Sequence, residues 1–217
     1  MKHIHLVLMS VLLSASASAK GEPAPTAEAG RNILGVSLAL NQWGLVGLQG
    51  ERVVGSRLAV GLGLRGGVQR TEGHFQVEEP VTPGAEQKLS SYMLGVGPYA
   101  RFFLTGTAPE GLWLSPRVEL TRWWTSWHSQ GELGWDSESE DRRWSIGGVA
   151  MLGYSAIVGR GLSLQVGAGA EVRHERGQML SRFTPQAGGN APAAEARGRS
   201  RAWHVRERIE ASLGWAF

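Results

Sequence analysis

The last nine residues of the chain, Ile209 to Phe217, alternate between two kinds of side chain. Every second residue is polar or small, and a period of two is the period of a β-strand. The segment is therefore predicted to be a strand with one wholly apolar face that ends on an aromatic residue. The residues of that face are Ile209, Ala211, Leu213, Trp215 and Phe217.

Seven further segments show the same alternation. The most regular is Leu162–Arg173, in which Leu, Val and Ala alternate with Ser, Gln, Gly and charged residues. Leu45–Val53 has a short apolar face, and Trp144–Ile157 is apolar on both faces, so its register stays open. The other four segments are Ile33–Leu40, Leu58–Gln69, Ser91–Leu104 and Leu112–Trp124. The last strand, predicted over Arg201–Phe217, brings the number to eight.

The predicted connections differ in length from one end of the strands to the other. The short turns lie at 55–56, 105–111 and 158–161, and the longer polar links lie at 71–90, 125–143 and 174–200. Only the first hairpin, at 41–44, is short on the side of the long links. Short turns on one side and longer loops on the other are typical of transmembrane β-barrels.

The N-terminal segment, Met1 to Ala19, has the organisation of a signal peptide. Lys2 is followed by an apolar run, Ile4–Leu13, and then by the small residues Ala17 to Ala19. The apolar run is about half the roughly 20 residues of a membrane-spanning helix, so cleavage before Lys20 is expected. Residues 20–31 are predicted to be a flexible lead-in. One domain, residues 32–217, is expected to follow.

Composition excludes several classes of protein. The chain has no cysteine, which excludes a disulfide framework and a lipid anchor on cysteine. Its net charge is only +3, and it has no basic stripe with interleaved aromatics, so no nucleic-acid partner is expected. Glycine is frequent, at 31 of 217 residues, without a collagen period. No segment after the signal peptide has the length and apolarity of a transmembrane helix. A transmembrane barrel also lacks such a segment, because its lipid-facing and lumen-facing residues alternate.

The face opposite the apolar one mixes glycine, alanine and serine with charged residues of both signs. Eight strands enclose an interior about wide enough for side chains alone, and buried charges must be paired. Arg117 is expected to pair with Glu119, Glu171 with Arg173, and Arg208 with Glu210. The predicted lumen charge network comprises Glu51, Arg65, Arg101, Arg117, Glu119, Glu171, Arg173, Arg206, Arg208 and Glu210. A soluble β-sandwich or barrel that turns this face to water is the alternative.

Aromatic residues gather near both ends of the predicted strands, as they do at the two interfaces of a membrane. The predicted interface aromatics near the short turns are Phe102, Trp113 and Tyr154. Those near the long links are Trp43, Tyr92, Trp123, Trp124, Trp144 and Trp203.

On its terminal Trp215-Ala216-Phe217, its alternation and its turn pattern, the chain from Ile33 onward resembles the small eight-stranded outer-membrane barrels typified by the OmpA membrane domain and OmpX. The resemblance implies an all-β, antiparallel, up-and-down transmembrane barrel in the outer membrane, with both termini periplasmic. It also implies that the apolar face of Ile209–Phe217 is the strand recognised by the barrel-assembly machinery. Pro98 and Pro116 depart from the pattern, because proline removes a ladder donor inside a strand, so bulges are expected there.

The long links carry three candidate chemistries. Ser126, His128, Ser129 and Glu132 supply a hydroxyl, an imidazole and a carboxylate, but proximity in sequence is not the geometry of a triad. The histidines, His74, His128, His174 and His204, lack metal-binding spacing, so neither a metal nor a cofactor is expected. One link is acidic (Asp136, Glu138, Glu140 and Asp141), and the next is basic (Arg176, Arg182, Arg197, Arg199 and Arg201).

Solvated surface loops are the simplest interpretation of these charges, and contact with the outer surface of the membrane is the functional alternative. Acidic residues would share divalent cations with lipopolysaccharide, and arginines would hold its phosphates in bidentate fashion. The expected partners are therefore outer-membrane lipid, with lipopolysaccharide as a candidate, and the barrel-assembly machinery. The predicted role is structural or surface interaction without catalysis. A small gated pore, a lipid-modifying enzyme at the outer rim and a soluble exported binding protein are the alternatives.

Overall fold

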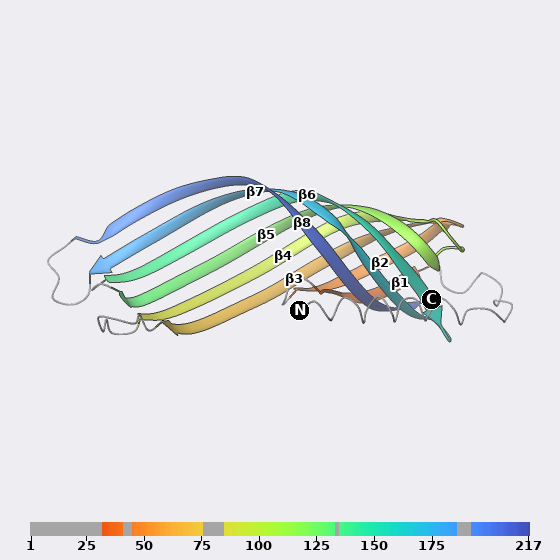
Figure 1. Cartoon of the computed structure of the whole chain (residues 1–217), viewed down its shortest axis with the longest axis horizontal. Helices are drawn as coiled ribbons and strands as arrows, with labels where there is room; N and C mark the ends of the chain where they lie inside the picture. The colour runs from red at the N-terminus through yellow and green to blue at the C-terminus, as the bar shows by residue number, and fades with distance from the viewer. Residues whose placement is uncertain (1–31, 41–44, 76–84, 133–134, 186–191) are drawn as a thin grey trace.

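The computed structural model describes residues 32–40, 45–75, 85–132, 135–185 and 192–217. Eight strands, each antiparallel to the next, form one sheet that closes through pairing of the first strand with the last (Figure 1). The predicted eight-stranded up-and-down barrel is confirmed. Its strands are β1 (Asn32–Ala39), β2 (Leu45–Gly55), β3 (Leu58–Phe75), β4 (Ala85–Phe103), β5 (Gly111–Glu132), β6 (Trp135–Val158), β7 (Leu162–Pro185) and β8 (Ala194–Ala216). The predicted signal peptide and lead-in, and Trp43, lie outside the described residues.

The strands tilt strongly around the barrel. The register that starts at Leu38 on β1 and passes through every strand in turn arrives at Arg201 on β8. Where the barrel closes, Leu38 pairs directly with Ala211 of β8. Following the register once around the barrel therefore leads to a position on β8 that is ten residues away, residue 201 instead of residue 211. A stagger of this kind is what a tilted sheet needs in order to close on itself.

Much of what the sequence predicted as long polar links is strand. The β3–β4 ladder continues to the pair Phe75–Ala85, and the β7–β8 ladder continues to Phe183–Ala194. The prediction was wrong here because backbone pairing does not require an apolar face. Where both faces are polar, the ladder continues but the alternation that reveals a strand disappears.

The two prolines are accommodated without the expected bulges. Pro98 on β4 and Pro116 on β5 both lie beside the β4–β5 seam, and this seam keeps one register from Glu86–Gln130 to Phe103–Trp113. Ladder pairs are missing near the two prolines, between Val96 and Phe102. A missing amide donor removes a hydrogen bond without adding a residue, so the seam opens locally and its register does not shift.

The closed ring occupies only one end of the molecule. β1 and β2 have 8 and 11 residues, whereas β6 and β7 have 24 each. The last β3 residue paired with β2 is Gly67, and Leu40 donates its amide to Ile209 at the end of the β1–β8 seam. Beyond that level β3 to β8 continue as an open, curved sheet, toward the left in Figure 1.

The large apolar side chains beside the two open edges are strongly exposed. Among the described residues, Val205, Trp203 and Val68 have the highest exposed fractions of any large apolar side chain, 75%, 69% and 64%. Val205 and Trp203 belong to β8 and Val68 to β3, just past the last residues that pair with β1 or β2. Their exposure follows from the missing neighbour strand. No described helix is long and apolar enough to cross a membrane.

Candidate functional site

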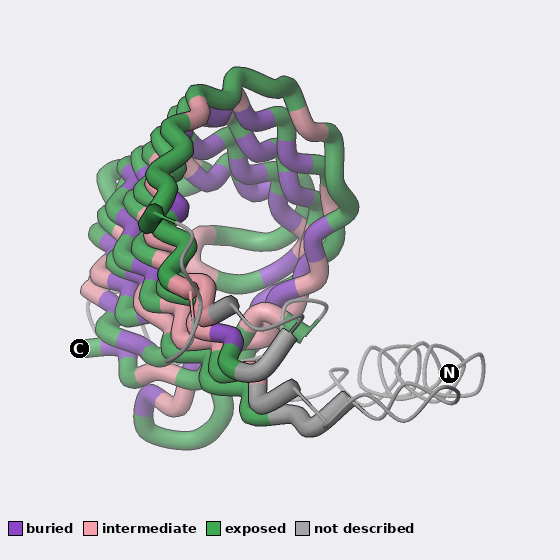
Figure 2. Tube along the Cα trace, turned by 90° about the vertical axis from the view of Figure 1, so that its left-hand side faces the viewer, coloured by how far each residue is buried: buried purple, intermediate pink, exposed green. Residues whose placement is uncertain are grey.

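The two faces of the barrel wall differ in burial and in chemical character. Buried and exposed residues alternate along the strands that form its wall (Figure 2). On β7, for example, Ser163 and Gln165 are buried, while Leu164 and Ala168 are exposed. The set that includes the buried polar residues therefore faces the lumen, and the exposed apolar set faces outward.

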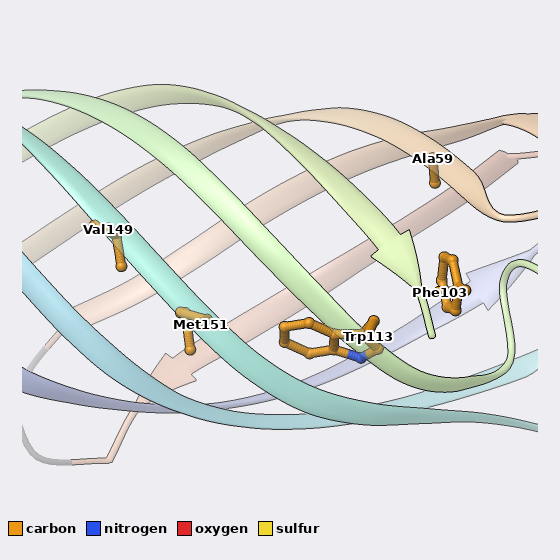
Figure 3. Packing of buried hydrophobic residues seen from close by; sticks show 5 residues of the cluster. All are labelled: Ala59, Phe103, Trp113, Val149 and Met151. Carbon is orange, nitrogen blue, oxygen red and sulfur yellow. The ribbon is translucent and has the colours of Figure 1, made fainter. Parts of the chain in front are cut away.

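An apolar cluster fills the lumen near the short turns. Its buried members are Ala59, Phe103, Trp113, Val149 and Met151 (Figure 3). Trp113 was predicted to be an interface aromatic, but its exposed fraction is only 2%. It shares the inward face of β5 with Ser115 and Arg117, both of which are buried. Trp123 belongs to the same inward series, so neither tryptophan lies on the outer surface.

Glycines make room for the ring of Trp113. Trp113 pairs with Gly153 on β6, and Gly153 pairs in turn with Gly167 on β7. A Cβ atom at either glycine would overlap the indole ring. The guanidinium of Arg101 lies 4.4 Å from the centre of this ring and makes an ion pair of 2.5 Å with Glu51. Aromatic and charged layers of the lumen are thus in direct contact.

Tyr99 connects this layer with the middle of the lumen. Its hydroxyl donates a hydrogen bond of 3.3 Å to Glu51, and the guanidinium of Arg117 lies 4.8 Å from its ring centre. Gly61 is the partner of Tyr99 in the β3–β4 register, and a Cβ there would contact the phenol ring at close range. The bulky residue again lies over a glycine of the neighbouring strand.

Five charged side chains form the central cluster: Arg65, Arg117, Glu119, Arg208 and Glu210. Arg208, whose side chain has no exposed surface, contacts Glu119 at 2.7 Å and Glu210 at 2.8 Å. Glu119 also pairs with Arg65, and Glu210 pairs with Arg117 at 3.1 Å. The cluster joins β3, β5 and β8 across the lumen. The predicted Arg208–Glu210 pair is present, but Arg117 pairs with Glu210 rather than with Glu119.

A third layer of charges lies further from the short turns. The Nε atom of Arg173 donates a hydrogen bond of 2.7 Å to Glu171, which is the predicted pair, and Glu175 lies 3.5 Å from the same guanidinium. Glu175 also faces Arg143 at 3.9 Å and His204 at 3.4 Å. The sequence interpretation missed Glu175 because it placed this residue in a link. The ladder of β7 continues past Arg173 and buries Glu175 on its inner face, but no apolar residues alternate there to reveal the strand in the sequence.

Nine of the ten residues of the predicted network are buried, and Arg206 is the exception. Arg206 is paired with Glu171 in the β7–β8 register, but it lies beyond Ile209, where β1 ends. With no β1 residue beside it, its side chain reaches solvent. Between the charged residues little space is left: the void lined by Gln49, Arg65 and Glu119 measures about 10 Å³, which is close to the room of one water molecule.

The outer surface of the closed ring is apolar. On β5, Leu114, Val118 and Leu120 are 42% to 55% exposed and alternate with the buried lumen residues. A continuous apolar surface of this kind is unfavourable in water and marks contact with a membrane or another protein. Six of the predicted interface aromatics are exposed on the outward face of the sheet, on the ring or just beyond it, namely Tyr92, Phe102, Trp124, Trp144, Tyr154 and Trp203.

The residues considered for catalysis are not brought together. Ser129 is buried on the inner face of β5, whereas His128 belongs to the outer face and its Nε2 lies 2.8 Å from Gln130 Nε2. The side chain of Glu132 is not among those described. Within the described residues no group of three or more His, Asp or Glu is arranged to hold a metal ion.

Comparison with known proteins supports the fold. No protein-family model and no curated protein matches the chain. A major outer membrane protein from Thermus thermophilus is 11% identical, with a TM-score of 0.51 over 85% of this chain and 99% of that one. Acinetobacter baumannii CarO is 10% identical, with a TM-score of 0.42 over 89% of this chain and 100% of that one. The likeness to the Thermus protein shows a shared barrel fold.

Proposed function

We propose that this protein is an outer-membrane β-barrel with a closed lumen, whose open extracellular sheet takes part in contacts at the cell surface. The observation that carries the proposal is the central cluster, in which Arg208 holds Glu119 and Glu210 together across the barrel. A lumen crossed by paired, desolvated charges offers ions no continuous water path. The apolar exterior and the fold shared with an outer membrane protein support the membrane location.

The difference between the two ends of the barrel supports one orientation in the membrane. Short turns, 56–57 and 159–161, and the C-terminal strand lie at the closed end, and this end is assigned to the periplasm. The long open sheet then extends outside the cell. The assembly machinery is expected to bind the apolar face of the last strand (Ile209, Ala211, Leu213, Trp215 and Phe217) before that strand pairs with β1.

Single-channel recording in a planar lipid bilayer tests the closed lumen. Correctly folded protein, identified by resistance to SDS until it is heated, is expected to give no conductance steps. The variant carrying Arg65→Ser and Arg208→Ser, which removes two guanidinium groups from the central cluster, is expected to conduct. A variant with Arg182→Ser and Arg197→Ser, far out on the sheet, is the matched control and should stay silent. Frequent steps from the unmodified protein would contradict the proposal.

A small gated pore is the second candidate, and one observation favours it. Glu119 is shared by Arg65 and Arg208, and Glu210 is shared by Arg117 and Arg208. Each carboxylate could keep an ion pair with one arginine while releasing the other. The side chains of the cluster therefore have more than one arrangement in which every carboxylate is paired. Rare, brief openings that disappear when Arg208 is replaced by Lys would support gating.

A further inference from the structure

Three arginines and a tryptophan occupy one row on the outer face of the sheet. Arg122 on β5 pairs with Trp144 on β6, Trp144 pairs with Arg176 on β7, and Arg176 pairs with Arg201 on β8. All four side chains are exposed. We call Arg122, Arg176 and Arg201 the arginine row.

The positive charges of the arginine row are not compensated within the described protein. No described acidic side chain lies within the 4.0 Å of an ion pair from any of the three guanidinium groups. Arg176 and Arg201 lie directly opposite each other on the adjacent strands β7 and β8. Two like charges in this position destabilise the pairing of the strands unless an anion lies between them. Two outward arginines on the same strands, Arg182 and Arg197, differ, since both pair with Glu195.

The row lies where the apolar surface ends. One step toward the closed end, the outward residues of β5 to β8 are Leu120, Ile146, His174 and Trp203. One step further are Val118, Gly148, Val172 and Val205. If the apolar surface lies in the bilayer, as the proposed function states, the arginine row lies at the level of the lipid headgroups.

Aromatic contacts hold part of the row in place. The guanidinium of Arg176 lies 5.4 Å from the ring centre of Trp144, and that of Arg122 lies 5.5 Å from the ring centre of Trp124. Stacking of this kind restricts a long side chain while leaving its donors free. A guanidinium presents a planar fork of N–H donors that matches two oxygens of a phosphate.

We propose that the arginine row is a binding site for the phosphate groups of an outer-leaflet lipid of the lipid A type. The inference deepens the proposed function and rests on its membrane placement. The acyl chains would lie along the apolar rows of β5 to β8, beside the exposed Val205 and Trp203. A phosphate between Arg176 and Arg201 would accept hydrogen bonds from both and remove their repulsion.

Lipid retention by the folded full-length chain tests the site. Native mass spectrometry from detergent would be compared for bisphosphorylated lipid A and for the same lipid after removal of both phosphates. The Arg176→Gln, Arg201→Gln variant is expected to bind the phosphorylated lipid about tenfold more weakly. The matched Arg182→Gln, Arg197→Gln variant, with the same charge change on the same two strands, should bind it as the unmodified protein does.

The other outcomes decide against the site. Equal affinity of the row variant and the unmodified protein, or equal affinity for the two lipids, would overturn the proposal. Displacement of the lipid by inorganic pyrophosphate at a concentration similar to that of lipid A would also overturn it, in favour of a site for free anions. Channel recording and SDS resistance of the same preparations test the proposed function separately, because the row does not face the lumen.

Discussion

Trp113 on β5 lies over Gly153 on β6, its partner in the ladder, and occupies the space that a side chain at position 153 would need. The same relation joins Tyr99 to Gly61 on the neighbouring strand. Large side chains on the lumen face are therefore matched with glycines at the paired position of the neighbouring strand. This matching makes room for large aromatic residues inside a narrow barrel.

The first prediction concerns this matching. Replacing Gly153 by Val should force the indole ring of Trp113 out of place, because the new Cβ would overlap it. A loss of about 1–3 kcal/mol in the free energy of unfolding is expected from overpacking. Urea unfolding in lipid vesicles would measure it. Gly148→Val on the same strand is the control, since the nearest atom to its Cβ is 4.0 Å away. Equal effects of the two changes would contradict the interpretation.

The second prediction concerns the central cluster. Arg208→Met leaves the carboxylates of Glu119 and Glu210 buried without one of their partners. Removing one side of a buried charge network typically costs about 3–5 kcal/mol. The temperature at which the protein loses its resistance to SDS should be lower for this variant than for the unmodified protein. Arg70→Met, which breaks an exposed ion pair with Glu72, should change the unfolding free energy by less than about 1 kcal/mol.

The third prediction uses the absence of cysteine from the sequence. Single cysteines at Val118 and Leu120 should react with a lipid-soluble maleimide in membranes and resist a charged, water-soluble one. Cysteines at Ser115 and Thr121, whose side chains are buried, should react with neither until the barrel unfolds. Reaction of position 118 with the water-soluble reagent would mean that the apolar face is in water.

The fourth prediction separates assembly from stability. Phe217 joins β1 through two backbone hydrogen bonds, of 3.0 and 2.9 Å to Asn32, while its side chain is 63% exposed. In the proposed placement this ring contacts lipid rather than protein, so Phe217→Ser should leave the packing of the barrel intact and lower the unfolding free energy by only about 1 kcal/mol. If the terminal strand is the assembly signal, the amount of barrel in the outer membrane should fall several-fold. A loss of unfolding free energy well above this value would show that Phe217 acts mainly in the folded state.

Strand faces could be predicted from the sequence because successive side chains point to opposite sides of any strand. Ser163, Gln165 and Glu171 could be assigned to the lumen without knowledge of their neighbours, and the structure buries all three. Strand ends could not be predicted in this way. Glu175 and Ser181 continue the buried series of β7 beyond the apolar surface, where the sequence shows no apolar alternation.

The sequence by itself determined the number of strands and, for every strand except Trp144–Ile157, the two faces and their chemical character, because these depend on a local period of two. Only the tertiary structure decided which charges meet. Arg117 reaches Glu210 on β8 rather than Glu119 on its own strand, and Trp113 turns inward over Gly153. Such partners depend on the stagger of the closed sheet, which no single strand contains.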